Sequence, residues 1–405
     1  MNIYESLGIR PVLNAAGPLT RLSGTILHPE VVAAMAEAAA ACVRMEELQA
    51  AAGRELAAAT GAAAGYVTAG AAAGLALGAA ACIAGLDPAA MDRLPETTDL
   101  RDEIVIQRAH LTAYTHALRL AGARLVEVGY LGYPGQGGAW PWQIEAGIGA
   151  RTAAVAFSVG RTPGTVALPE IVAIAHRHGL PVIVDAAASL PPVDNLRRFI
   201  AAGADLVAFS GGKAIGGPQA TGILVGRADL IASVALQHQD MDVHPATWTE
   251  RGRYLTNGQL AGPPHHGLGR PMKVGKEAIA GLIVALRRFL AHDQRAARRA
   301  DEERLATIIG ALAGIPGVQA ALLADEAAPR PYATALVRID ERVLGRSVEA
   351  LVNELDTGDP PIAVSQNFLH ERAIGLVASA LQPGEERAVA ARLRDILTRR
   401  DGDPA

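Results

Sequence analysis

The chain has 405 residues, of which 50% are hydrophobic and 19% charged, so it can bury a large core and is long enough for two or three domains. Its formal net charge is −4 and no long basic run is present, so the electrostatic footprint of a nucleic-acid-binding protein is missing. Two cysteines, Cys42 and Cys82, cannot build a multi-bridge disulfide framework, which favours a reducing, cytoplasmic compartment.

The N-terminal half holds one segment that a hydropathy scan could take for a membrane span. The N-terminus itself carries Glu5 and no apolar stretch, so we expect no signal peptide. No charged residue occurs from Leu56 to Leu86, but the segment consists mostly of alanine and glycine. A buried strand-turn-helix explains this composition better than a membrane span does, and we expect no membrane partner.

The first predicted elements alternate between helix and strand. We expect helices over 29–50 and 54–60, a glycine-rich turn at 69–74 that leads into a helix to about residue 84, a strand over 104–107, a helical stretch over 112–121 and a strand over 124–128.

The alternation is clearest between residues 152 and 226. Strands are predicted over 152–158, 182–184, 204–210 and 221–225, and helices over 169–178 and 195–202. Strands that alternate with helices of about ten residues indicate a largely parallel sheet covered on both faces.

A Pro/His/Gly-rich stretch (262–271) precedes the C-terminal part of the chain. A long helical region is expected over about 272–313, followed by strands near 317–323 and 332–339 and helices near 347–355 and 383–399. We therefore predict an N-terminal segment (1–50), a large domain (51–271) and a linking helix with a small C-terminal domain (272–405). Only the last five residues, DGDPA, look disordered.

Two ionisable residues stand at the ends of consecutive predicted strands. Asp185 ends the run PVIVD, and Lys213 follows the run ADLVAFSGG. Ligands of open α/β sheets bind beyond the carboxyl ends of the strands, so both side chains are expected in one crevice. Pyridoxal 5′-phosphate (PLP) needs such a pair, because a lysine forms an imine with it and a carboxylate keeps its pyridine nitrogen protonated. Taken singly, Asp185 could instead cap a helix, and Lys213 could lie on an exposed loop.

Small residues on both sides of this region suit a phosphate group. The run 210–212 (Ser-Gly-Gly) precedes the lysine, where glycines let the backbone approach a ligand and the serine can donate to a phosphate. The run 68–74 is a small-residue turn that opens a helix, and the N–H groups of such a helix end bind anions. Close helix packing would explain the second run equally well on its own. A Walker loop is excluded, because Val207 and Ala214 stand where its glycine and its Ser/Thr would be.

Six segments together resemble fold-type-I PLP enzymes of the aminotransferase class V kind, and more narrowly the selenocysteine synthase-like group that includes D-glucosaminate-6-phosphate ammonia-lyase. They are LNAAGPLTRL (13–22), VTAGAAAGLALGAAACIAG (67–85), EIVIQRAHLTAY (103–114), VDAAASLPP (184–192), FSGGKAIGGPQATGILVG (209–226) and HHGLGRPMKVGKE (265–277). The resemblance covers nearly the whole chain. It implies an α/β fold-type-I architecture, with a mainly parallel seven-stranded sheet sandwiched by helices and a smaller C-terminal α/β domain.

The resemblance also implies a role for each matching residue. For the cofactor, Lys213 would be the Schiff-base lysine, Asp185 the partner of the pyridine nitrogen, Ala187 a small residue against the ring, His110 a group that stacks on the ring or relays protons, and Ala71, Ala72 and Ser210 the phosphate ligands. For the substrate, Gln219 and Arg270 would lie near the active site of a neighbouring subunit, with Arg270 as a clamp for a carboxylate or phosphate. A surface histidine and a surface arginine are the alternatives for His110 and Arg270.

Two features separate the chain from selenocysteine synthases. Those enzymes tend to have an acidic residue before the lysine, where this chain has Gly212, and they carry an extra N-terminal region for tRNA, whereas this chain reaches its first shared motif by Leu13. With a net charge of −4, a tRNA substrate is disfavoured. The adjacent histidines His265 and His266 lack further ligands, so no metal is predicted.

The predicted reaction begins with removal of the α-proton of a hydroxy amino acid or aminosugar acid, with Lys213 as general base. Loss of the β-hydroxyl, for which His110 or Tyr114 could supply the acid, would then lead to a 2-oxo acid and ammonia. Racemisation or epimerisation is the alternative, and aldolase-type cleavage is third. From other classes, a non-catalytic binding relative and a nucleotide-binding enzyme are less favoured. The uncharged segment 56–86 and the resemblance favour a homodimer or a larger even-numbered oligomer.

Overall fold

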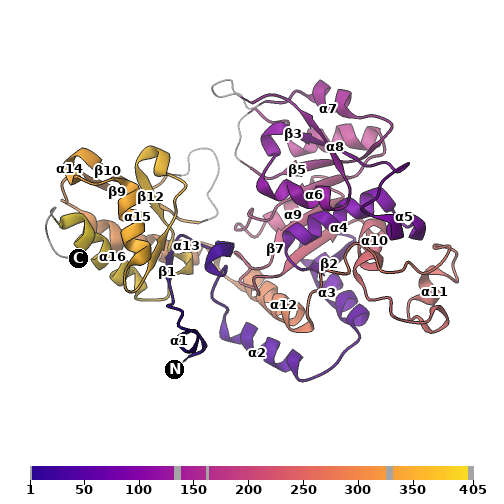
Figure 1. Ribbon diagram of the computed structural model, residues 1–405, viewed down its shortest axis with the longest axis horizontal. Helices are drawn as coiled ribbons and strands as arrows, with labels where there is room; N and C mark the ends of the chain where they lie inside the picture. Colours follow the sequence, from indigo (N-terminus) through magenta and orange to yellow (C-terminus); the bar gives the residue numbers. More distant parts are fainter. Residues whose placement is uncertain (1, 132–137, 161–163, 325–331, 400–405) are drawn as a thin grey trace. The chain divides into compact units, whose positions relative to one another are not determined.

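A computed structural model of the chain describes residues 2–131, 138–160, 164–324 and 332–399. Contacts divide it into two compact units, one formed by Leu27–Leu290 and one by Met1–Ile26 together with Ala291–Ala405 (Figure 1). The units are defined by compactness alone. The three-part division of the chain into 1–50, 51–271 and 272–405 therefore stays a prediction.

The larger unit is built on a seven-stranded sheet with the strand order β2-β8-β7-β6-β5-β3-β4. All neighbouring strands are parallel except β8, which runs antiparallel to both β2 and β7. The strands are β2 (Ala64–Thr68), β3 (Glu103–Gln107), β4 (Arg124–Val128), β5 (Thr152–Ser158), β6 (Val182–Asp185), β7 (Leu206–Ser210) and β8 (Gly222–Gly226). The predicted mainly parallel seven-stranded sheet is confirmed.

Helices cover both faces of this sheet (Figure 1). One core contains α4 (Ala71–Ala84), α5 (Pro88–Arg93), α6 (His116–Leu120), α10 (Ala228–His238) and the short α11 (Arg251–Tyr254). The other contains α2 (Pro29–Ala39), α3 (Met45–Thr60), α7 (Pro141–Gly147), α8 (Leu168–Arg177), α9 (Asn195–Ala201) and α12 (Lys276–Ala291). Along β3, Ile104 and Ile106 belong to the first core and Val105 to the second, which is the period of two that a sheet buried on both faces requires.

The single helix predicted over 29–50 is wrong, because the chain leaves the helical conformation between Ala39 and Met45. Glu46 and Glu47 lie in the first turn of α3, where acidic side chains interact favourably with the helix dipole. This acidic pair is the sequence signal that marks a new helix start.

The long helical region predicted over 272–313 is likewise divided into two helices. Asp293 caps α13 (Gln294–Leu312) by accepting hydrogen bonds from the N–H groups of Arg295 and Ala296. An aspartate at a helix start satisfies N–H groups that the helix leaves without partners, so the helix begins anew at this residue.

The uncharged segment Leu56–Leu86 is confirmed as a buried strand-turn-helix, formed by the end of α3, by β2 and by α4. Since β2 lies at the edge of the sheet, its outer side needs partners from elsewhere in the chain. The buried Gln49 of α3 provides them: its amide donates to the carbonyl of Val67 (2.9 Å) and accepts from the N–H of Val67 (3.1 Å).

The smaller unit contains a three-stranded antiparallel sheet and a two-stranded parallel one. In the first, β10 (Ala335–Ile339) lies between β9 (Val318–Leu322) and β12 (Ala373–Leu376); in the second, β1 (Leu13–Ala15) pairs with β11 (Ile362–Val364). Its helices are α1 (Ile3–Ser6), α13, α14 (Glu341–Leu344), α15 (Val348–Thr357) and α16 (Glu385–Thr398). The β1–β11 pair joins the N-terminal motif 13–22 to the C-terminal part of the chain.

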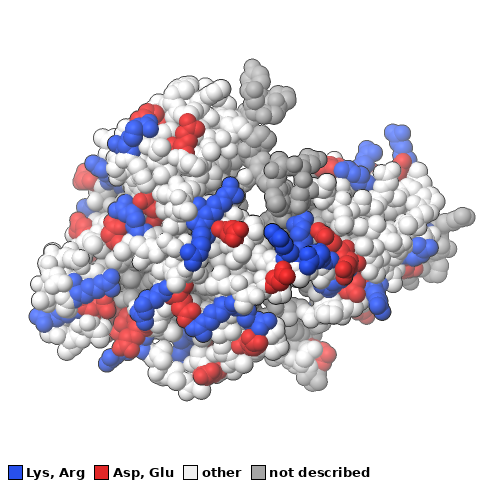
Figure 2. Space-filling view, turned by 180° about the vertical axis from the view of Figure 1, so that it is seen from behind, with Lys and Arg blue, Asp and Glu red and all other residues white. Residues whose placement is uncertain are grey.

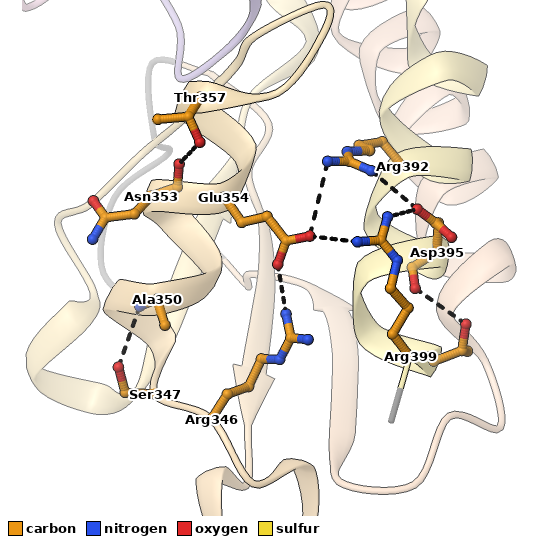
Figure 3. Close-up of polar contacts among 10 residues, drawn as sticks. Arg346, Ser347, Ala350, Asn353, Glu354, Thr357, Arg392, Asp395 and Arg399 are labelled. Atoms are coloured by element: carbon orange, nitrogen blue, oxygen red, sulfur yellow. Dashed lines mark hydrogen bonds and ion pairs between the residues drawn. The ribbon is translucent and has the colours of Figure 1, made fainter. Parts of the chain in front are cut away.

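An ion-pair network holds α15 against α16 in this smaller unit (Figure 3). The carboxylate of Glu354 accepts from Arg346 (2.8 Å) and from Arg399 (2.9 Å). Arg399 also pairs with Asp395, which lies 3.0 Å from Arg392. The carboxylate of Glu354 in α15 therefore links this helix to Arg346, which precedes it, and to Arg399 at the end of α16.

The face of the molecule in Figure 2 carries Lys and Arg interspersed with Asp and Glu. Opposite charges that lie side by side cancel at distances beyond about 10 Å in physiological salt. Within the described ranges, none of the helices combines the length and the apolar composition needed to cross a bilayer.

Candidate active site

The carboxyl ends of β2, β5, β6 and β7 and the start of the antiparallel β8 lie at one edge of the large sheet, where the strands end. Ser158 at the end of β5 pairs with Asp185 at the end of β6. Ser210 at the end of β7 pairs with Gly222, which in turn pairs with Thr68 at the end of β2. In the neighbouring pair β6 and β7, Asp185 lies opposite Ala208, so Ser210 lies two residues further along β7 than the partner of Asp185. Both groups of residues lie at the end of the strands where a crevice is expected.

Asp185 and Lys213 lie close enough for the charge of each to act on the other. Burial raises the pKa of the Asp185 carboxyl, against the N–H of Ala187 (3.1 Å) and the charge of Lys213. Burial lowers the pKa of the Lys213 ammonium, and the charge of Asp185 opposes this shift. Both pKa shifts favour the neutral form of the group, so the two side chains do not fully stabilise each other's charge. A protonated pyridine nitrogen beside Asp185 would supply the missing positive charge, and in this respect the residues fit PLP.

The loop that carries Lys213 is folded tightly between β7 and β8. The N–H of Gly211 donates to Thr221 (2.8 Å), and the N–H of Gly217 donates to Gly211 (2.9 Å). A Cβ atom on Gly212 would lie 2.7 Å from the carbonyl oxygen of Gln219. An acidic side chain before the lysine, as in selenocysteine synthases, therefore has no room here. The predicted site residue Gln219 is exposed, and its backbone forms the wall behind Gly212.

The predicted phosphate turn lies directly on this edge. Gly70, at φ +105°, begins α4 in a conformation that L side chains rarely adopt, and no side chain caps the helix. The N–H groups of Ala71 and Ala72 therefore have no partner within the helix. A Cβ on Gly222 would lie 2.6 Å from the nitrogen of Ala71, so the turn touches the strand that pairs with Ser210.

Ser210 lies at the same end of the sheet as this turn. Its hydroxyl makes no hydrogen bond to any residue that the structure describes. Backbone N–H groups at a helix start and a hydroxyl in the adjoining strand are donors that suit a phosphate. The predicted residues Ala71, Ala72 and Ser210 are thus brought together.

His110 is only 4% exposed, which disagrees with the alternative of a surface histidine. It follows β3, and the N–H of Ser158 donates to its Nδ1 (3.4 Å). The ring of Phe157 meets the imidazole edge-on, with 4.5 Å between ring centroids. Burial lowers the pKa of His110 to about 4, so the ring is neutral at physiological pH. The structure places it beside the strand next to the one that carries Asp185.

Tyr114 is 58% exposed and borders a small cavity that reaches Asp185. Phe157 and Ser158 line the same cavity. Phe157 and Ser158 were not predicted as site residues, although their position at the end of a predicted strand was a usable signal.

Arg270 is not brought to Lys213 within this chain. Its guanidinium pairs with Asp240, just beyond α10, and the N–H of Gly269 donates to Gln237 of that helix (2.9 Å). In the described residues, Asp185 is the charged group that shifts the pKa of Lys213. The role of Arg270 in a neighbouring subunit's site stays a prediction.

One cluster of potential metal ligands lies near this arginine. Ligand atoms of Asp240, Asp242 and His266 approach one another within 4.8 Å. All three residues are exposed, and Arg270 already neutralises Asp240. We assign no metal to this cluster.

Comparisons with known proteins agree with this geometry. The sequence model of the aminotransferase class-V family matches residues 87–256. The chain is 36% identical to a Streptomyces 5′-C-glycyluridine monooxygenase-decarboxylase, over 99% of this chain and 93% of that protein. It is 32% identical to the D-glucosaminate-6-phosphate ammonia lyase of Salmonella typhimurium, over 98% of each chain. It is 30% identical to an L-seryl-tRNA(Sec) selenium transferase of Solidesulfovibrio magneticus, over 56% of this chain and 50% of that one. The solved structure of a D-glucosaminate-6-phosphate ammonia-lyase matches with a TM-score of 0.80 over 98% of each chain at 31% identity.

The first prediction concerns the lysine that binds the cofactor. We expect the protein to show a visible absorption band that borohydride abolishes, because an imine to a lysine absorbs there and a reduced amine does not. Peptide mapping should then find the pyridoxyl group on Lys213. A label on any other lysine, or a colourless protein that ignores added PLP, would falsify this assignment.

The second prediction tests the contact between the phosphate turn and the sheet. Gly222→Ala places a methyl group against the backbone of Gly70 and Ala71, so the turn must move away from β8. We expect PLP affinity, measured by absorbance titration of the apoprotein, to fall about tenfold or more. Gly149→Ala is the matched control, since a Cβ there meets nothing within 4 Å. Equal affinity in both variants would mean that the turn does not bind the phosphate.

Proposed function

Because the chain belongs to the aminotransferase class-V-like, selenocysteine synthase-like family of fold-type-I PLP enzymes that includes D-glucosaminate-6-phosphate ammonia lyase, we propose that it is an ammonia-lyase for a hydroxy amino acid or an aminosugar acid. It is a PLP-dependent enzyme. The proposal is supported by the sequence similarity to the ammonia lyase, which is 32% identical over 98% of each chain. It is also supported by the Asp185–Lys213 pair at the sheet edge.

Different residues at this edge would bind different parts of the cofactor. Lys213 would hold it covalently, and Asp185 would hold its ring nitrogen. The N–H groups of Ala71 and Ala72 and the hydroxyl of Ser210 would bind the phosphate, while Ala187 and His110 would contact the ring. Bound PLP supplies an electron-accepting ring that stabilises negative charge on the α-carbon of an amino acid.

The side chains that remain would handle protons and the leaving group. Burial lowers the pKa of Lys213, which increases the share of neutral amine available to take the α-proton. His110 and Tyr114 would hold the β-hydroxyl as it leaves. Overall, a hydroxy amino acid becomes a 2-oxo acid and ammonia, since the water lost with the hydroxyl is taken up again on hydrolysis.

A second candidate is an oxygen-dependent decarboxylation. Its support is the 36% identity to the glycyluridine monooxygenase-decarboxylase over 99% of this chain. A nucleoside-linked amino acid would then be the substrate, and dioxygen would be consumed. Racemisation or epimerisation is the other alternative, since it needs the same α-proton removal without a leaving group.

The third prediction tests these alternatives on a panel of D- and L-hydroxy amino acids, aminosugar acids and a nucleoside-linked amino acid. An ammonia-lyase should release ammonia and 2-oxo acid in equal amounts without oxygen uptake. His110→Ala should lower ammonia release about tenfold or more and α-deuterium exchange less, because the residue would assist the leaving hydroxyl rather than the α-proton. Oxygen uptake with carbon dioxide release would support the decarboxylase instead. Deuterium exchange with loss of optical rotation and no ammonia would support a racemase or epimerase.

We also propose that the enzyme is cytoplasmic and works as a homodimer or larger even-numbered homo-oligomer on small molecules, without nucleic-acid or membrane partners. Arg270 and Gln219 of one subunit would then serve the site of the next. The position of Arg270 beside Asp240, and not beside Lys213 of its own chain, supports this arrangement.

The fourth prediction is complementation between subunits. Lys213→Ala and Arg270→Ala should each be inactive alone, but co-expressed subunits should regain about a quarter of the wild-type activity, because half of the dimers are hybrids with one intact site. Sedimentation should show the dimer. No recovery in verified hybrids, or an active monomer, would contradict the shared site.

A further inference from the structure

Gln107 ties together two parts of the candidate site that are distant in sequence. It is the last residue of β3 and is 1% exposed. Its Oε1 accepts from the N–H of Val166 (2.7 Å), and its Nε2 donates to the carbonyl of Val166 (3.1 Å). The opposite orientation of the amide would bring two donors together and two acceptors together, so this pairing determines which atom is Nε2. Gln107 thereby holds the segment after β5 against the end of β3.

The second N–H of the same amide points at His110. Nε2 of Gln107 lies 3.5 Å from Nδ1 of His110, and the N–H of Ser158 donates to that same Nδ1 (3.4 Å). Both groups are donors only, so Nδ1 must accept and cannot carry a proton. The proton of the neutral ring therefore belongs on Nε2, for which the described residues provide no partner.

The other surroundings of the ring favour the neutral form as well. Phe157 meets it edge-on, and the two groups that hydrogen-bond to the imidazole, the Gln107 amide and the Ser158 N–H, carry no charge. Burial lowers the pKa of His110 to about 4. A second proton could enter only at Nδ1, where it would face two N–H groups.

We propose that Gln107 is a positioning residue that keeps His110 in the Nε2–H form, so that His110 offers a hydrogen-bond donor to the site and no basic nitrogen. The proposal rests on the proposed PLP site, within which it selects between the roles open to His110. A neutral imidazole of this form binds an oxygen of the substrate or the cofactor through Nε2. It does not remove protons, and that work falls to Lys213.

The fifth prediction is measured on the wild-type holoenzyme by NMR with ¹⁵N-labelled histidine. The His110 signals, assigned by their loss in His110→Gln, should show the pattern of a ring protonated at Nε2. They should not titrate between about pH 5.5 and 8, where an ordinary histidine changes charge. A proton on Nδ1, or a pKa near the ordinary value, overturns the proposal without any variant of Gln107.

A charge-changing variant tests the role of Gln107 itself. Gln107→Glu replaces the donor at Nδ1 with an acceptor, so the proton should move to Nδ1 and the pKa of His110 should rise by about one unit or more. Gln49→Glu is the matched control. Gln49 is also buried, and its two amide atoms hydrogen-bond to the backbone of one residue, Val67, but it makes no hydrogen bond to an imidazole. Its His110 signals should equal those of the wild type.

The possible outcomes separate this inference from the reaction assigned above. Unchanged His110 signals in a folded Gln107→Glu protein would show that Gln107 does not set the tautomer. The measured quantity is the position of the proton on the His110 ring, so the result does not depend on whether the enzyme eliminates, racemises or decarboxylates. A failure of the substrate panel would therefore leave this result intact.

Discussion

The candidate site depends on two half-buried ionisable side chains, Asp185 at the end of β6 and Lys213 in the loop after β7. Removing a carboxylate and an ammonium from water costs more than their mutual attraction returns, unless further groups complete the set of charges. Asp185 and Lys213 show this deficit, because burial shifts both pKa values toward the neutral forms. The pair is thus prepared for a ligand that brings its own charge, which distinguishes it from a structural ion pair such as Arg346–Glu354.

Backbone contacts define the shape of the site around this pair. Gly212 lies against Gln219, and Gly222 lies against Gly70, in both cases closer than a side chain would allow. These contacts bring main-chain N–H groups to the edge, and such groups cannot change rotamer. Donors of fixed direction bind an anion with little loss of conformational entropy, since they are ordered before the ligand arrives. The absence of side chains at these glycines is therefore part of the chemistry of the site.

Much of the fold and part of the site could be predicted from the sequence. Asp185 and Lys213 follow unbroken apolar runs, and parallel strands bring such positions to one edge whatever the details of packing. The break between α2 and α3 was missed because both helices are alanine-rich, so periodicity does not separate them. The contacts of Gln107 with Val166 and of His110 with Ser158 were not predictable, since they join residues 59 and 48 positions apart and depend on how β3 and β5 align. The predicted role of Arg270 in a neighbouring subunit's site concerns an assembly, so a single chain does not test it.

The side chain of Gln49 protects the edge strand β2 from pairing with a second chain. An edge strand with free N–H and C=O groups invites a second chain to extend the sheet, which is how many proteins aggregate. Here Gln49 occupies both outward groups of Val67, beside the phosphate turn. A strand from another molecule would have to displace this amide and leave it unpaired in the interior. Extension of the sheet by a second chain is therefore opposed at Val67 of β2.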